Sequence, residues 1–144
     1  MPVVVKRVYD PAARSDGSRV LVDRLWPRGV SKARAALDAW LRDLSPSDRL
    51  RQWFHANPGA WTSFRKRYLK ELSRREAASA LSQLYDMARG RKQLTLLFAS
   101  KNAEHNNATV LKDLLDGMRK PPTGTGPAGA KVARQSQAKR MPRG

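Results

Sequence analysis

The sequence predicts an α/β fold, a small layered structure in which helices flank a mostly parallel or mixed sheet. Strand-like and helix-like segments alternate along the chain, which is typical of this class. Two of the strand-like segments, Val20-Leu21-Val22 and residues 94–99, are apolar with almost no interruption, as in strands that are buried on both faces. With 144 residues, the chain is long enough to bury a sizeable core.

The first strand is predicted at residues 3–9, which are rich in β-branched side chains, and Asp10-Pro11 ends it. Asp16-Gly17 marks a turn, and the second strand follows at residues 19–25. The connection between them is short for the crossover that joins parallel strands, so the direction of the first strand stays open. Residues 37–44 fit either a short strand or a helix.

Three helices are predicted between residues 45 and 90. Ser45 is interpreted as the N-cap of the first, with Pro46 at its first helical position. Asn57-Pro58 is interpreted as the cap of the second, and the Ser73 to Glu76 segment as the capping box of the third, which Gly90 ends. The second helix carries apolar residues at spacings of three and four, namely Trp61, Phe64, Tyr68 and Leu72.

The strand at residues 94–99 leads through Ser100-Lys101 to Asn102, which is predicted to cap a last helix that ends at Gly117. We therefore expect a single domain over residues 1–117. Residues 118–144 are rich in Pro, Gly, Lys and Arg and have almost nothing to bury, so they are predicted to form a disordered basic tail.

The composition restricts the function. The net charge is +17, and residues 118–144 contribute seven basic side chains and no acid, so the remainder carries +10. A charge of this size favours a polyanionic partner, either nucleic acid or a phosphorylated small molecule. Cysteine is absent and there are only two His, so we expect no thiolate chemistry, no metal site and no cofactor. Neither a signal peptide nor a membrane span is visible, which predicts a cytoplasmic protein.

Polar residues follow both apolar strands at the point where each one ends. Asp23, Arg24, Trp26 and Arg28 come directly after Val22, while Lys101 and Asn106 follow the strand at residues 94–99. If these strands are parallel neighbours, both groups lie at one edge of the sheet, where α/β folds bind ligands. Arg and Lys beside a helix N-terminus suit an anion such as phosphate. Asp10 joins this edge if the first strand is parallel as well.

Each candidate also has a structural interpretation. Asp23 either acts chemically or pairs with a nearby cation and holds the loop, and Trp26 either stacks on a ligand or packs in the core. Asn102 is interpreted as a helix cap. A pair of carboxylates formed by Asp23 with Asp10 or with Glu104 stays open, because sequence does not show their separation. No nucleophile elbow, Walker loop or dinucleotide fingerprint is present.

The same residues carry a family resemblance. The segments at residues 6–11 and 19–29, Leu37-Asp38 with Trp40, and residues 94–97 with Lys101-Asn102 and Asn106 resemble the YeaO-like branch of a bacterial family known as a domain of unknown function. The similarity spans about residues 6–115. It implies a compact cytoplasmic α/β domain without a settled activity.

Three hypotheses for the function follow from the sequence. The first is an anion-binding pocket at the sheet edge, formed by Arg24, Arg28, Lys101 and Asn106 with Trp26. The second is an enzyme that acts on nucleotides or nucleosides, with Asp23 or Asp10 as the reactive carboxylate and the Arg residues as a clamp. The third is a protein whose loop of Arg and Trp residues docks another protein.

Overall fold

A computed structural model of the chain describes residues 3–90 and 92–118. These residues form two compact units, one of residues 3–45 and 86–118 and the other of residues 46–85. The prediction of one domain over residues 1–117 stays a prediction. The predicted basic tail lies outside the described residues, apart from Met118.

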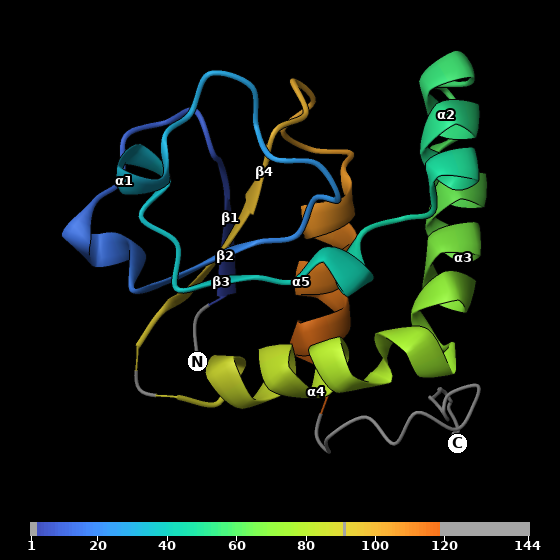
Figure 1. Cartoon of the computed structure of the whole chain (residues 1–144). Helices are drawn as coiled ribbons and strands as arrows, with labels where there is room; N and C mark the ends of the chain where they lie inside the picture. The colour runs from blue at the N-terminus through green and yellow to red at the C-terminus, as the bar shows by residue number, and fades with distance from the viewer. Residues whose placement is uncertain (1–2, 91, 119–144) are drawn as a thin grey trace. The chain divides into compact units, whose positions relative to one another are not determined.

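The first unit is built on a four-stranded parallel sheet (Figure 1). Its strands are β1 (Val3–Arg7), β2 (Ser18–Leu21), β3 (Ala39–Trp40) and β4 (Leu94–Phe98), in the order β1-β4-β2-β3. This confirms the α/β class. It also settles the direction of the first strand, which runs parallel to its neighbour β4. The last strand in the sequence is thus inserted between the first two.

The insertion of β4 explains how a short connection can join two parallel strands. β1 and β2 are not adjacent, and the chain between them passes β4 through one 3₁₀ turn, η1 (Arg14–Asp16), and the predicted turn at Gly17. Gly17 has φ of 67° and ψ of −129°, a conformation that essentially only glycine adopts. A β-carbon at this position would collide with the backbone carbonyl of Gln93, which precedes β4.

The core of the first unit follows from the strand pleat, because alternate side chains point to opposite faces. Every residue of β4 is buried. On one face Leu97 packs with Val8 and Leu21. The helix α5 (Asn107–Gly117) packs against β1 and β4, and Figure 1 shows it and the short helix α1 (Lys32–Ala35) on opposite sides of the strands. Both faces are covered, which explains the continuous apolar runs.

The predicted strands were too long: β1 ends at Arg7 and not at residue 9, and β4 ends at Phe98 and not at residue 99. β2 ends at Leu21 and not at residue 25, because the chain turns away from β4 after the Val22 N–H has bonded to the Leu97 carbonyl. Residues 37–44 are neither one strand nor one helix: β3 covers only Ala39–Trp40, and a 3₁₀ turn, η2 (Arg42–Leu44), follows. Because this edge strand has only two residues, it exposes few unpaired backbone N–H and C=O groups.

The second unit contains α2 (Asp48–Ala56), α3 (Trp61–Leu72) and the greater part of α4 (Arg75–Ala88). α2 and α3 lie side by side and antiparallel. Their interface is aromatic, with the Phe54 and Phe64 rings stacked at a centroid distance of 4.3 Å. Phe64, Tyr68 and Leu72 are buried, as the apolar stripe predicted.

The predicted N-caps of these helices were wrong, although the helices themselves were right. The N-cap of α2 is Ser47, whose Oγ accepts the Leu50 N–H at 3.1 Å, so Pro46 precedes the cap. Asn57 donates its Nδ2 back to the Trp53 carbonyl at the end of α2, and α3 begins four residues later. Ser73 donates its hydroxyl to the Lys70 carbonyl at the end of α3. Ser and Asn serve either end of a helix, because their short side chains reach nearby backbone groups in both directions.

Candidate functional site

The candidate site is the carboxyl edge of the parallel sheet, where the loops that follow β1, β2 and β4 begin. Asp23 stands at the end of β2, and one of its carboxylate oxygens accepts the Ala99 N–H at 2.8 Å. The other accepts Nδ2 of Asn107, the first residue of α5, at 3.0 Å. Asn107 Nδ2 also donates to the Val22 carbonyl at 2.8 Å. These contacts favour the structural interpretation of Asp23, in which its carboxylate holds the loop, and two of its partners are amide groups.

Arg7 ties the same loop to the other neighbouring strand. From the end of β1, its Nε donates to the Ser100 carbonyl at 3.0 Å, and its Nη2 donates to the Ala99 carbonyl at 3.2 Å. The guanidinium also lies 5.1 Å from the centre of the Tyr9 ring. The start of the loop between β4 and α5 is thus fastened on one side to β2 and on the other to β1.

The rest of that loop is folded by its own Asn residues. Asn102 Oδ1 accepts the N–H groups of Glu104 and His105, at 3.0 and 2.9 Å, and Asn106 Nδ2 donates to the Asn102 carbonyl. The cap of α5 is Asn106, whose Oδ1 accepts the Thr109 N–H at 3.0 Å. The prediction that Asn102 caps this helix was wrong. The helix begins at Asn107, so the poor helix propensity of Asn106 matters little.

These contacts change how an anion could be held here. The sequence-based hypothesis relied on N–H groups at the start of the last helix. The N–H groups of Glu104, His105 and Thr109 are already bonded to Asn side chains. These three N–H groups are therefore not available to an anion, and the Asn106 side chain is used to cap the helix.

Trp26 and Trp40 form the apolar wall of this edge. Their rings meet edge to face at 5.3 Å and pack against the cluster of Val8, Leu21 and Leu97. Trp26 donates its indole N–H to the Val30 carbonyl at 2.6 Å, and Trp40 donates to the Asp23 carbonyl at 2.7 Å. Both indoles thus hold the loop after β2, which favours the packing interpretation of Trp26.

The remaining predicted residues differ in exposure. Arg28 and Lys101 are exposed, and neither side chain makes a hydrogen bond or an ion pair within residues 3–90 and 92–118. Arg24 is half-buried in the loop after β2. Asp10 is exposed at the end of β1, and its backbone N–H donates to the Arg7 carbonyl. The parallel ladder of β2 and β4 means that the loops carrying Arg28 and Lys101 start at adjacent strand ends.

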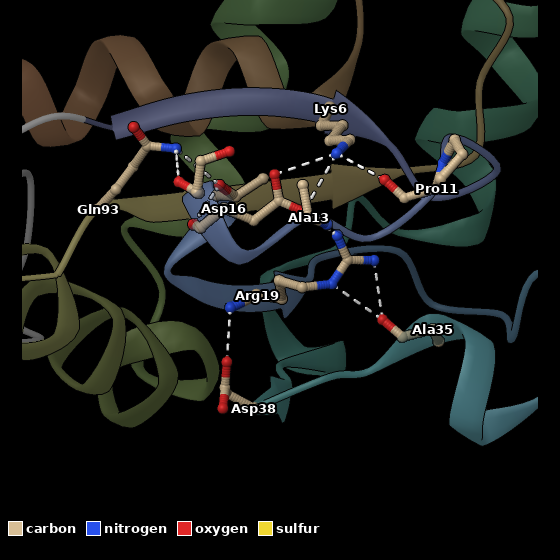
Figure 2. Close-up of polar contacts among 10 residues, drawn as sticks. Lys6, Pro11, Ala13, Asp16, Arg19, Ala35, Asp38 and Gln93 are labelled. Atoms are coloured by element: carbon tan, nitrogen blue, oxygen red, sulfur yellow. Dashed lines mark hydrogen bonds and ion pairs between the residues drawn. The ribbon is translucent and has the colours of Figure 1, made fainter.

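A second polar cluster lies within the sheet of this unit (Figure 2). The buried Asp16 carboxylate accepts from Lys6 Nζ at 3.0 Å, from Arg19 Nη1 at 2.5 Å and from the Ala13 N–H at 2.9 Å. Burial raises the pKa of Asp16, but the hydrogen bonds from Ala13, Lys6 and Arg19 outweigh it and hold the pKa below its ordinary value. Arg19 completes its own bonding through Nε and Nη2 to the Ala35 carbonyl.

This cluster was missed by sequence reasoning, as were Arg7 and Asn107. Its members are saturated by one another and by backbone groups, and Thr95 Oγ1 donates to the Asp16 carbonyl at 2.6 Å. We infer that this polar cluster has a structural role and holds the turn before β2 and the loop before β3 in place. The signal that could have found it was a charged residue beside the Val residues of each strand, Lys6 in β1 and Arg19 in β2.

Comparison with known proteins identifies the family. Residues 2–126 match a family model described as "Inactive DUF488-N3 subclade". The chain belongs to this family. It is 47% identical over 115 residues to "Uncharacterized protein YeaO" of Escherichia coli (strain K12), a match covering 80% of this chain and 97% of that protein.

The similarity extends to other bacteria. The chain is 38% identical over 115 residues to "Uncharacterized protein Rv3073c" of Mycobacterium tuberculosis, covering 80% of this chain and 94% of that protein. No solved structure matches. The resemblance to YeaO-like proteins in the DUF488 family is thus confirmed.

Two further findings concern the residues that the structure describes. No group of three or more His, Cys, Asp or Glu side chains among them could hold a metal ion. None of their helices is both long enough and apolar enough to cross a membrane.

Proposed function

We propose that this DUF488 protein is a non-catalytic binding protein that takes a phosphate-bearing anion at the carboxyl edge of its parallel sheet. One observation carries the proposal. The loop between β4 and α5 is held on both sides, by Asp23 from β2 and by Arg7 from β1. Lys101 stands in this fixed loop. A site that is ordered before its ligand arrives loses less entropy on binding.

The cations supply the chemistry. Arg24 and Arg28 follow β2, and Lys101 follows the adjacent β4. A guanidinium can grip a phosphate with two parallel hydrogen bonds, and an ammonium adds a point charge. The net charge of +17 favours the approach of any polyanion. The ligand class is therefore a phosphorylated small molecule, a nucleotide or a nucleic-acid phosphate, and the absence of cysteine suits a reducing cytoplasmic compartment.

The enzyme hypothesis has weaker support. Asp23 already accepts two hydrogen bonds from structural groups, which leaves it poorly suited to act as an acid, a base or a nucleophile. Asp10 is exposed, and no base or acid partner is bonded to it within the described residues. The matching family is described as an inactive subclade, which also favours binding over catalysis.

Titration with pyrophosphate, followed by amide NMR shifts, tests the proposal. We expect saturable shifts in the loops at residues 22–31 and 99–106. Arg28→Ala and Lys101→Ala should each weaken binding by about tenfold or more, since a charged hydrogen bond contributes about 1.5 kcal/mol or more. Both side chains are exposed, so the variants should stay folded.

The matched controls are Arg14→Ala and Lys92→Ala. Both residues are exposed and precede strands β2 and β4, so they stand at the amino edge of the same sheet. Each control variant removes one positive charge but leaves the residues of the proposed site unchanged. If the control variants lost as much pyrophosphate affinity as the site variants, the effect would be due to net charge alone. Absence of pyrophosphate binding by the wild type at about 50 mM salt would refute the proposal.

A further inference from the structure

The second unit presents a cationic face that the proposed anion site does not include. Successive helical residues are rotated by about 100°. On α3, Lys66, Arg67 and Lys70 therefore fall within an arc of about 100°, with Ser63 as the fourth member. All four are exposed. The buried stripe of α3 is centred roughly 150° away from this arc.

Two acidic residues of this unit have bonding partners outside this arc. The Glu71 carboxylate is occupied at the start of α2, where it accepts the Ser47 N–H at 2.8 Å and the Ser47 hydroxyl at 2.6 Å. Asp48 lies 3.6 Å from Arg51, also on α2. Within the part of the chain that the structure describes, neither Lys66 nor Lys70 has a side-chain partner.

An aromatic ring lies beneath one of these cations. The Arg67 guanidinium stacks over the Trp53 ring, 4.0 Å from its centre, yet Arg67 is exposed. The guanidinium is therefore positioned over an indole of α2. Unlike a Lys ammonium, a guanidinium offers a second planar face on which a further ring can stack.

The pairing of the two helices places one more cation on this face. α2 and α3 are antiparallel, with Ser47 bonded to Glu71 and Trp53 stacked on Arg67. Arg49 precedes Trp53 by one helical turn and is exposed, so it lies near the level of Lys70. Successive levels are about 6 Å apart along the helices. The charges are thus spread along a line, which suits an extended polyanion better than a single phosphate.

We propose that this face, formed by Arg49, Trp53, Lys66, Arg67 and Lys70, binds single-stranded nucleic acid. The cations contact successive phosphates. One base stacks on the outer face of the Arg67 guanidinium, whose inner face lies over the Trp53 ring. Cations along the backbone combined with a stacking platform are the two elements of sequence-independent single-strand binding. The proposal concerns residues of the second unit alone, so it does not depend on the sheet-edge site.

The test uses the full chain and two probes, a fluorescein-labelled oligothymidylate of twelve nucleotides and a linear polyphosphate of equal charge. Arg67→Lys retains the charge but removes the planar platform. We expect it to weaken oligothymidylate binding about fivefold or more, because a stacked base contributes about that much. Its salt dependence and its affinity for polyphosphate should match the wild type.

A double variant, Lys66→Gln with Lys70→Gln, tests the phosphate contacts. Each lost contact to a single strand should reduce the slope of log K against log salt by about 0.7, so the pair should reduce it by about 1.4. Arg75→Gln is the control, since this exposed residue of the same unit lies at the start of α4. It should change the affinity less than twofold.

Three results would overturn the proposal. Wild-type affinities that are equal for polyphosphate and oligothymidylate would show that no base is recognised. Unchanged oligothymidylate binding by Arg67→Lys would remove the stacking platform. If Arg75→Gln weakened oligothymidylate binding by half as much as the double variant does, the contribution of Lys66 and Lys70 would be explained by net charge alone. All three readouts are interpretable because every substituted side chain is exposed, and a thermal melt checks folding.

Discussion

Replacing Asp23 by Asn separates a structural carboxylate from a chemical one. The Asp23 carboxylate accepts hydrogen bonds from two donors, the Ala99 N–H and Asn107 Nδ2. An Asn side chain has one acceptor oxygen and one NH₂ donor. It can therefore serve only one of the two partners, and its NH₂ must face the other donor.

The expected cost follows from these two contacts. The surviving hydrogen bond changes from charge-assisted to neutral, which loses about 1 kcal/mol. The partner that is left unbonded adds about 1–3 kcal/mol for a donor buried without an acceptor. We expect Asp23→Asn to lower the free energy of unfolding by about 2–4 kcal/mol in total.

Urea unfolding followed by tryptophan fluorescence measures this change, and hydrogen exchange at the Ala99 amide locates it. Trp26 and Trp40 pack in the same unit and report on it. Asp10→Asn is the matched control, because Asp10 is the other candidate carboxylate and is exposed. It should stay within about 0.5 kcal/mol of wild type. A change for Asp23→Asn as small as that of the control, with protection at Ala99 intact, would refute the structural role.

Further predictions concern other fixed points of the fold. Because the pKa of Asp16 is depressed in the folded state, its stabilising contribution is complete above the ordinary Asp value and is lost as the pH falls through the lower folded value. Asp16→Asn should therefore cost about 3 kcal/mol or more at pH 7, and the difference from wild type should narrow below about pH 4 in urea titrations. Gly17→Ala should destabilise more than Gly29→Ala, which has open space around it and should cost only the left-handed penalty of about 1–2 kcal/mol; equal melting temperatures would contradict this. Glu71→Ala should cost about 1 kcal/mol, through loss of the contacts to the first residues of α2, in the same urea assay.

The fold was largely predictable because its strands and helices carry strong periodic patterns. The continuous apolar residues of β4 predicted a strand covered on both faces, and every one of them is buried. The stripe of Phe64, Tyr68 and Leu72 predicted the buried face of α3. The caps were less predictable. Ser73 and Asn57 bond to the helix that precedes them, and nothing in their local sequence distinguishes that choice from capping the next helix.

The sequence predicted that two loops share one edge of the sheet, but it did not predict the contacts between them. Two apolar strands ending in polar residues predicted that the loops at Asp23 and Ser100 would share one edge, and the parallel pairing of β2 with β4 confirms it. The contact itself is made by Asn107, one residue beyond the candidate Asn106. The position at which α5 begins determines the roles of these two adjacent Asn residues. Asn106 caps the helix, and Asn107 donates to the Val22 carbonyl after β2. That register depends on a loop folded by Asn102, which sequence alone does not reveal.

The contacts of Asp23 also restrict the chemistry that this edge can perform. A general acid or base must gain and lose a proton in each turnover. Protonating Asp23 would place a hydrogen between its carboxyl group and one of two N–H donors, and would weaken the attachment of the loop that carries Lys101. Catalysis through Asp23 would thus loosen its own site in each cycle. The hydrogen bonds from Ala99 and Asn107 are therefore what we expect of a carboxylate with a structural role.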